Sequence, residues 1–222
     1  LKYLLSEKGI TEINIAPVTS IYYANMTNDY FEFLYLSKGF QLNNSELTIA
    51  VRVLQNDDYP LSSYEHRVKK FVKQGERNGL NFKICDDIAT AYEIIENNRT
   101  RFSKKPTHTL AELKTISRLF PGRLLQFIAF KDKLPVAVCC LLLCNGYVAY
   151  SFYIDQMRTH SALRPVNYIV NQALRWLKDN NFSYLDFGPS TFGLEPHYSL
   201  IFFKEGFGGK GIIKHFYQYK IK

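Results

Sequence analysis

The chain has 222 residues, with 28 Lys or Arg against 20 Asp or Glu, so its formal net charge is +8. Hydrophobic residues make up 46% and aromatic residues 15% of it, a balance that excludes disordered, collagen-like and coiled-coil proteins. The longest apolar run, residues 134–144, is about half of the ~18 residues that a transmembrane helix needs. No transmembrane segment is therefore expected. The chain begins with Leu1 rather than Met and shows no signal peptide, so we expect a fragment whose missing start could hold a targeting signal.

The cysteine and histidine residues predict neither a disulfide framework nor a metal site. The four cysteines, Cys85, Cys139, Cys140 and Cys144, lack a C-x-x-C spacing, and three of them lie in one apolar run. We expect buried, reduced thiols, which fit a cytoplasmic protein. The five histidines are scattered along the sequence, so no metal ligand set is predicted.

The first third of the chain predicts alternating helices and strands. Gly9 and Gly39 each follow a helical pattern, as C-terminal helix caps do. The expected elements are a helix, a short strand, a second helix and a β-rich run, over residues 1–8, 10–15, 29–38 and 47–54.

A basic, amphipathic helix is predicted over residues 62–78, with Tyr64, Val68, Phe71 and Val72 on its apolar face. Residues 62–83 hold six Lys or Arg against two Glu, and residues 203–222 hold five Lys against one Glu. Such clusters suit a phosphate-bearing ligand, a nucleic acid or an anionic surface, although either could be an ordinary solvated face.

From residue 80 onward the pattern predicts a mixed sheet. After a strand over residues 80–85, Asp86 or Asp87 caps a helix, and Thr109 with Glu112 forms a capping box for the next one. Asn145-Gly146 is a hairpin signal. The later elements are strands at 124–130, 135–143 and 147–154, a helix at 165–179, a strand at 184–187, a helix at 197–205 and a strand at 212–221. An antiparallel meander followed by a β-α-β crossover predicts an α/β (α+β) fold with a mixed sheet.

The sequence also contains a repeat. LKYLLSEKGITEINIAP at 1–17 aligns with LRWLKDNNFSYLDFGP at 174–189, and Tyr35-Leu36-Ser37-Lys38-Gly39-Phe40 aligns with Phe202-Phe203-Lys204-Glu205-Gly206-Phe207. A chance likeness of two α/β units is the alternative. The repeat predicts the back half of a first domain at 1–60, a basic connecting helix at 61–82 and a complete second domain at 83–222.

Three segments carry a family resemblance. The Tyr-x-x-x-Gly-Phe that ends at Phe40 resembles the last helix of the GNAT acyltransferase fold. Together with the tandem arrangement, PTHT at 106–109 and FFKEGFGGK at 202–210 look like the FemAB-like branch of that superfamily. The resemblance implies a mixed, mostly antiparallel GNAT-like sheet flanked by helices. Many such proteins transfer an amino acid from aminoacyl-tRNA to a peptidoglycan precursor.

The resemblance implies that the chain transfers an acyl group to an amine. That reaction needs a positioned carbonyl, a deprotonated amine and a stabilised oxyanion. In the GNAT fold the sheet splays between two parallel strands, here residues 147–154 and 184–187. Lys204, which matches the family's lysine near the transferred group, is the first catalytic candidate, and Asp186 and Asp155 are proton acceptors. We expect Lys204→Ala to abolish transfer and leave folding intact, as for an exposed side chain. The candidate residues for binding the substrate or donor are Phe203, Tyr153, Gly188, His197, Tyr198, Arg67 and Arg164.

Two departures from the GNAT pattern bear on the acyl donor. Residues 156–162 (QMRTHSA) lack the glycines of the loop that holds the CoA pyrophosphate. The usual tyrosine that protonates the departing thiolate is replaced by Phe202, whereas Tyr35 keeps it in the first copy. No cofactor is expected to stay bound, and the donor is acyl-CoA or aminoacyl-tRNA. The acceptor is a small molecule or a peptidoglycan precursor, and tRNA is a candidate partner. The alternative is a catalytically silent module that binds an anionic partner through its basic helix and C-terminal strand.

Overall fold

A computed structural model describes residues 10–23, 29–100 and 103–220. The chain forms two compact units. The first contains Leu1–Ile49, Pro189–Phe202 and Gly211–Lys222, and the second contains Ala50–Gly188 and Phe203–Lys210. The helix predicted over residues 1–8 lies outside the described residues. The predicted repeat boundaries stay a prediction.

In the second unit the strands are ordered β2-β7-β6-β5-β4-β3. The pairs β3–β4, β4–β5 and β5–β6 are antiparallel, and β6–β7 is parallel. The mixed, mostly antiparallel sheet is therefore confirmed. The strands are β2 (Gln41–Arg52), β3 (Leu80–Cys85), β4 (Leu124–Lys131), β5 (Leu134–Leu143), β6 (Val148–Gln156) and β7 (Tyr184–Pro189). The helices are α3 (His66–Arg77), α4 (Ile88–Thr100), α5 (Leu110–Leu119), α6 (Pro165–Asp179) and the end of α7 (Tyr198–Glu205).

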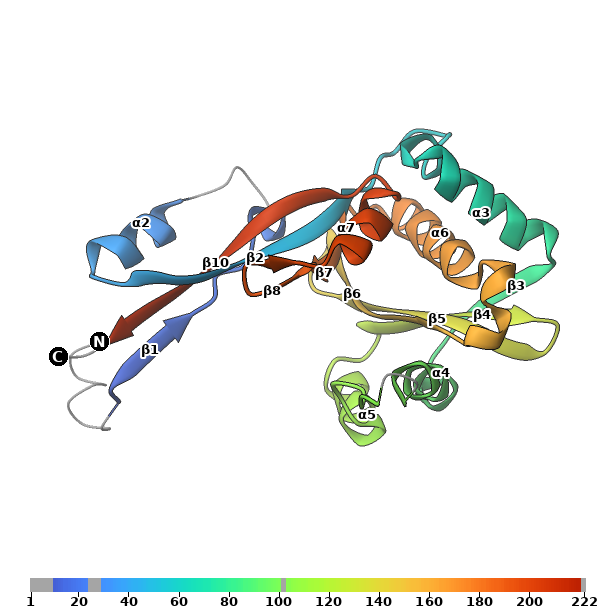
Figure 1. Ribbon diagram of the computed structural model, residues 1–222, viewed down its shortest axis with the longest axis horizontal. Coiled ribbons are helices and arrows are strands. Elements are labelled where there is room, and N and C mark those ends of the chain that lie inside the picture. Colours follow the sequence, from blue (N-terminus) through green and yellow to red (C-terminus); the bar gives the residue numbers. More distant parts are fainter. Residues whose placement is uncertain (1–9, 24–28, 101–102, 221–222) are drawn as a thin grey trace. The chain divides into compact units, whose positions relative to one another are not determined.

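Helices cover both faces of this sheet (Figure 1). On β4, Phe127 and Ala129 pack in the core under α3 and α6, whereas Ile128 packs in the core under α4 and α5. This alternation is the period of two that a strand imposes on its side chains. Because all three residues are fully buried, β4 is a central strand with apolar side chains on both faces.

The first unit is built on a smaller strand set. It holds β1 (Glu12–Ile15), α2 (Tyr30–Ser37), the larger part of β2 and β10 (Lys210–Lys220), in the strand order β1-β10-β2. β1 pairs antiparallel with β10, with Glu12 opposite Lys220. Gly39 has φ +86° and ends α2 as expected. A two-strand hairpin, β8 (Thr191–Phe192) with β9 (Glu195–Pro196), precedes α7.

Local signals predicted most helix boundaries correctly, with one clear exception. Thr109 and Glu112 make the predicted capping box, and Asp87 accepts hydrogen bonds from Thr90 at the start of α4. The basic helix, however, begins at His66 rather than at residue 62, because Leu61–Ser63 forms a 3-10 turn. The Glu65 amide then donates to Gly206 O at 3.0 Å, so a tertiary contact sets where the helix starts.

In the described part of the chain the four cysteines form no disulfide, but they are not all buried. Cys139 and Cys140 are buried, and desolvation raises the pKa of the Cys139 thiol to about 12. Cys144 is exposed, so the expectation of a buried thiol is wrong there, because it lies beyond the last β5 residue. None of the helices described is long and apolar enough to cross a membrane.

Candidate active site

The two parallel strands of the second unit part after a short pairing. β6 pairs with β7 from Val148↔Tyr184 to Tyr150↔Asp186, although both strands continue beyond these residues. On its other edge, β6 shifts register so that Cys140 and Leu141 oppose Tyr153 and Ser151. The shift leaves Phe152 as a bulge, which bends a strand and increases its local twist. The geometry matches the splay that the resemblance implied.

Lys204, the first catalytic candidate, lies at the end of β7. It is only 6% exposed, and its Nζ donates to Gly188 O at 2.8 Å. Asp186 Oδ1 accepts from the Gly188 amide at 2.7 Å. Lys204, Asp186 and Gly188 are thus brought together. The expectation of an exposed Lys204 is wrong, because α7 presents it to the end of β7.

Gly188 is held in a backbone conformation that favours glycine. Its φ is +73°, and a Cβ there would lie 2.8 Å from the Tyr150 hydroxyl. A side chain would therefore need both an unfavourable backbone and displacement of Tyr150. The absence of a side chain lets the Gly188 carbonyl face Lys204 while Tyr150 lies against its α-carbon.

Burial changes the proton affinity of the lysine. Desolvation lowers the pKa of Lys204 from 10.5 to about 8, and the negative charge of Asp186 opposes this lowering. Lys204 is therefore mostly an ammonium at neutral pH but loses its proton far more readily than a surface lysine. Such a group can both stabilise negative charge and donate a proton.

Aromatic side chains pack beside Lys204 along the chain. The Phe203 ring lies 6.4 Å from that of Phe187 and 5.2 Å from that of Phe207. Phe203 is half-buried against the main core, so it packs with the core from a position next to Lys204.

Arg67 donates to Glu65 at 2.9 Å, and its Nη2 lies 2.8 Å from where a Cβ of Gly206 would be. Arg67 is thus placed at the turn after α7.

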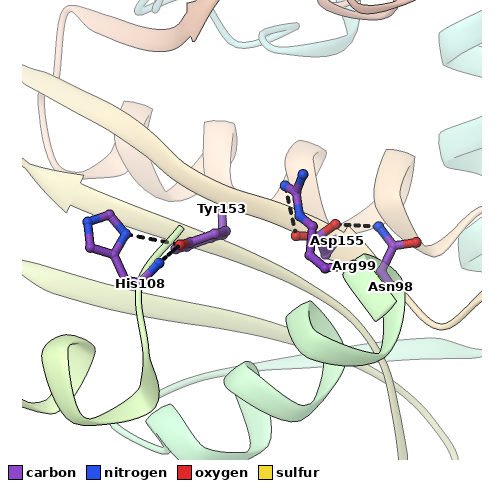
Figure 2. Close-up of polar contacts among 5 residues, drawn as sticks. All are labelled: Asn98, Arg99, His108, Tyr153 and Asp155. Atoms are coloured by element: carbon purple, nitrogen blue, oxygen red, sulfur yellow. Dashed lines mark hydrogen bonds and ion pairs between the residues drawn. The ribbon is translucent and has the colours of Figure 1, made fainter. Parts of the chain in front are cut away.

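Asp155 and Tyr153 belong to a different cluster, on the α4 and α5 face (Figure 2). Asp155 is 3% exposed, accepts a hydrogen bond from Asn98 Nδ2 and lies 3.5 Å from Arg99 Nη2. Burial raises the pKa of its carboxyl, and the Arg99 charge opposes that rise. No contact described here joins Asp155 to Lys204 or Asp186, so the three catalytic candidates fall into two groups.

His108 completes the second group and was not among the candidate site residues. Its amide donates to the Tyr153 hydroxyl at 3.1 Å, and its Nδ1 lies 3.0 Å from the same oxygen. Figure 2 shows both contacts. The only sequence signal for His108 is its place in the PTHT segment, because its partner is 45 positions away.

The remaining candidates are His197, Tyr198 and Arg164, and the first and last of them make local contacts. In the first unit, His197 Nδ1 accepts from the Leu200 amide at 3.4 Å and so caps the start of α7, and Tyr198 is 75% exposed. In the second unit, Arg164 precedes α6 with φ +61° and lies 4.1 Å over the Phe71 ring.

The loop between β6 and α6 is not built like a pyrophosphate loop. Residues 158–163 form a 3-10 helix, in which the amides of His160 and Arg164 donate to Met157 O and Ser161 O. The first residue of α6 is Pro165, which has no amide hydrogen. Two backbone amides that precede this helix are therefore used within the loop, and its first residue has none to offer to a pyrophosphate. Among the residues described, no three His, Cys, Asp or Glu side chains form a metal-binding group.

Solved structures with the same fold are known. The crystal structure of FemX matches with a TM-score of 0.79 and 14% identity, over 99% of this chain and 74% of FemX. The C-terminal domain of a lysylphosphatidylglycerol synthetase from Agrobacterium fabrum matches with a TM-score of 0.67 and 10% identity, over 98% and 70% of the two chains. A tandem GNAT protein from the clavulanic acid biosynthesis pathway matches with a TM-score of 0.56 and 12% identity, over 99% and 67%. No protein-family model and no curated protein matches the chain by sequence. The chain therefore has the fold of GNAT and FemAB-like proteins, as the resemblance implied.

Proposed function

We propose that this protein is a cytoplasmic acyltransferase that moves an acyl or aminoacyl group from an activated donor to an amine. The observation that carries the proposal is the buried ammonium of Lys204, which donates a hydrogen bond to Gly188 O at the end of β7. Gly188 lies two residues after Asp186, the last β7 residue that pairs with β6. GNAT-fold proteins of known activity transfer acyl groups, and the splay is where the superfamily places its acyl donor.

In this reaction Lys204 would stabilise the negative charge that develops during transfer. The amine nitrogen bonds to the donor carbonyl carbon, and the carbonyl oxygen becomes an oxyanion. Collapse of this intermediate breaks the C–O or C–S bond of the donor, the nitrogen loses a proton and the leaving group gains one. An ammonium with a pKa of about 8 suits the oxyanion or the departing oxygen, because it is charged at neutral pH and can give up its proton. Asp186 keeps Gly188, and with it the Lys204 acceptor, in place.

Among the two donors, the loop before α6 favours an aminoacyl ester over acyl-CoA. The amides of His160 and Arg164 already donate within the loop, so they offer little to a pyrophosphate. Aminoacyl-tRNA is therefore the donor that we propose, with acyl-CoA as the alternative. A peptidoglycan precursor amine is the acceptor class that the resemblance favours.

The test compares Lys204→Met with Lys210→Met, a matched control in the same FFKEGFGGK segment whose side chain is exposed. Each protein is incubated with aminoacyl-tRNA or acyl-CoA and an amine acceptor, and product is measured by mass spectrometry. We expect Lys204→Met to lose at least about a hundredfold in transfer rate, whereas Lys210→Met keeps the wild-type rate. The wild-type rate should also fall as pH rises through about 8, because the ammonium is then lost.

Two results would contradict the proposal. Wild-type activity in Lys204→Met would remove Lys204 from the mechanism. Failure of the wild-type protein to transfer from either donor would favour the silent binding module, for which the basic α3 supplies a surface. That module is recognised by binding that weakens steeply as salt rises from about 50 to about 200 mM.

A further inference from the structure

A pocket of about 550 Å³ lies between α3 and α6 of the second unit, two helices that run side by side in Figure 1. Lys69 and Lys73 reach it from α3, one turn apart, and Arg175 and Lys178 reach it from α6. Four cations from two packed helices therefore face one cavity. This pocket is not part of the Lys204 site, because none of its lining residues has a described contact with Lys204 or Gly188.

The four cations in this pocket lack close ion pairs, although three carboxylates reduce the formal charge of its lining to about +1. Within the described part of the chain, no carboxylate lies within 4.0 Å of Lys69, Lys73 or Lys178. Arg175 has one long contact, 3.9 Å to Glu76. Three exposed carboxylates also line the pocket, those of Asp57, Asp58 and Asp179. They reduce the net charge without pairing with the three lysines, so the ammonium groups keep their capacity to donate to an anion.

Tyr59 forms part of the wall of the same pocket. Its side chain is 4% exposed, and its hydroxyl oxygen is enclosed by protein atoms. Burial raises the pKa of Tyr59 above its usual range, so the hydroxyl keeps its proton. The capacity of the pocket to hold an anion therefore comes from its cations.

We propose that this pocket binds a phosphoryl group. A phosphoryl group offers strong acceptor oxygens and negative charge, which suits four cations on two converging helices. Two sources have this chemistry: a small phosphorylated or diphosphorylated molecule, and a backbone phosphodiester of RNA. The site is independent of the transfer reaction, so it can exist whether or not Lys204 is catalytic.

The experiment measures binding of pyrophosphate and of a short RNA duplex to the full chain by isothermal titration calorimetry. Lys73→Ala removes one cation of the pocket, and Lys70→Ala removes the same charge from an exposed position on α3 that does not line it. We expect Lys73→Ala to weaken binding about tenfold, as the loss of one charge-assisted hydrogen bond does. Lys70→Ala should leave pyrophosphate affinity unchanged.

The two ligands identify the source of the phosphate. Pyrophosphate binding that Lys73→Ala weakens more than Lys70→Ala indicates a small phosphorylated molecule. RNA binding with the same difference between variants, without pyrophosphate binding, indicates a backbone phosphodiester. The proposal is overturned if neither probe binds, or if Lys70→Ala and Lys73→Ala weaken binding equally, which would show only diffuse attraction to a basic helix.

Discussion

Replacing Lys204 by Met should make the protein more stable at neutral pH while abolishing transfer. In the folded chain Lys204 is 6% exposed, and burial lowers its pKa from 10.5 to about 8. In the unfolded chain the lysine is solvated and keeps the higher pKa. The folded state therefore carries the cost of a buried cation whenever the pH is below about 8.

The magnitude follows from the two pKa values. The lowering from 10.5 to about 8 corresponds to about 3 kcal/mol that the wild type loses at pH 7. Met removes this cost but leaves Gly188 O without the donor that now lies 2.8 Å away, which costs about 1 kcal/mol. Lys204→Met should thus gain about 2 kcal/mol at pH 7, which raises the melting temperature by roughly 4–8 °C for a chain of this size.

The dependence on pH provides the sharper test. The folded-state pKa is below the unfolded one, so the stability of the wild type recovers as pH rises from about 8 to about 10.5. Urea unfolding of both proteins at about pH 7 and about pH 10 should therefore show the advantage of the variant at the lower pH and most of it gone at the higher pH. A difference between the two proteins that does not change with pH would refute the argument that the folded state buries a charged Lys204.

Three further predictions concern single positions. Gly188→Ala should destabilise the protein by about 1–3 kcal/mol in urea unfolding, because alanine tolerates φ +73° poorly and its Cβ would lie 2.8 Å from the Tyr150 hydroxyl. Asp155→Asn should be at least as stable as the wild type at neutral pH, where the raised pKa of Asp155 shows that its charged form is costly; its advantage should shrink as pH falls and the wild-type carboxyl is protonated. Thr109→Ala should lower the unfolding free energy by about 1 kcal/mol, since it breaks the capping box of α5, and an unchanged urea midpoint would show that the box adds nothing.

Features set by neighbouring residues were predictable from the sequence. The Thr109 capping box, the start of α6 at Pro165 and the end of α2 before Gly39 each depend on a few consecutive positions. The mixed sheet followed from the order of these elements and from the Asn145 hairpin. There, Asn145 Oδ1 accepts from the amides of Tyr147 and Val148.

Features set by distant residues were not predictable in the same way. The burial of Lys204 depends on Gly188, 16 positions earlier, and a lysine on a short helix gives no local sign of it. His108 and Tyr153 meet across 45 positions. The late start of α3 depends on Gly206, which accepts from the Glu65 amide. In each case the deciding contact joins segments whose proximity only the folded chain establishes.

The energetics of Lys204 themselves bear on function. A lysine whose role were structural would be expected to add stability, yet the lowered pKa of Lys204 shows that its charged form reduces it. The neighbouring Gly188 has a second unusual property, a φ of +73° at a position where a Cβ would lie 2.8 Å from the Tyr150 hydroxyl. The pairing of β6 with β7 ends before Gly188 and does not require this conformation. Strained backbone conformations and side chains with strongly shifted pKa values are concentrated at sites where a protein binds or transforms a ligand. If Lys204→Met raises the stability and abolishes transfer, the cost in stability and the activity both depend on the Nζ of Lys204. If Lys204→Met lowers the stability, this lysine has a structural role.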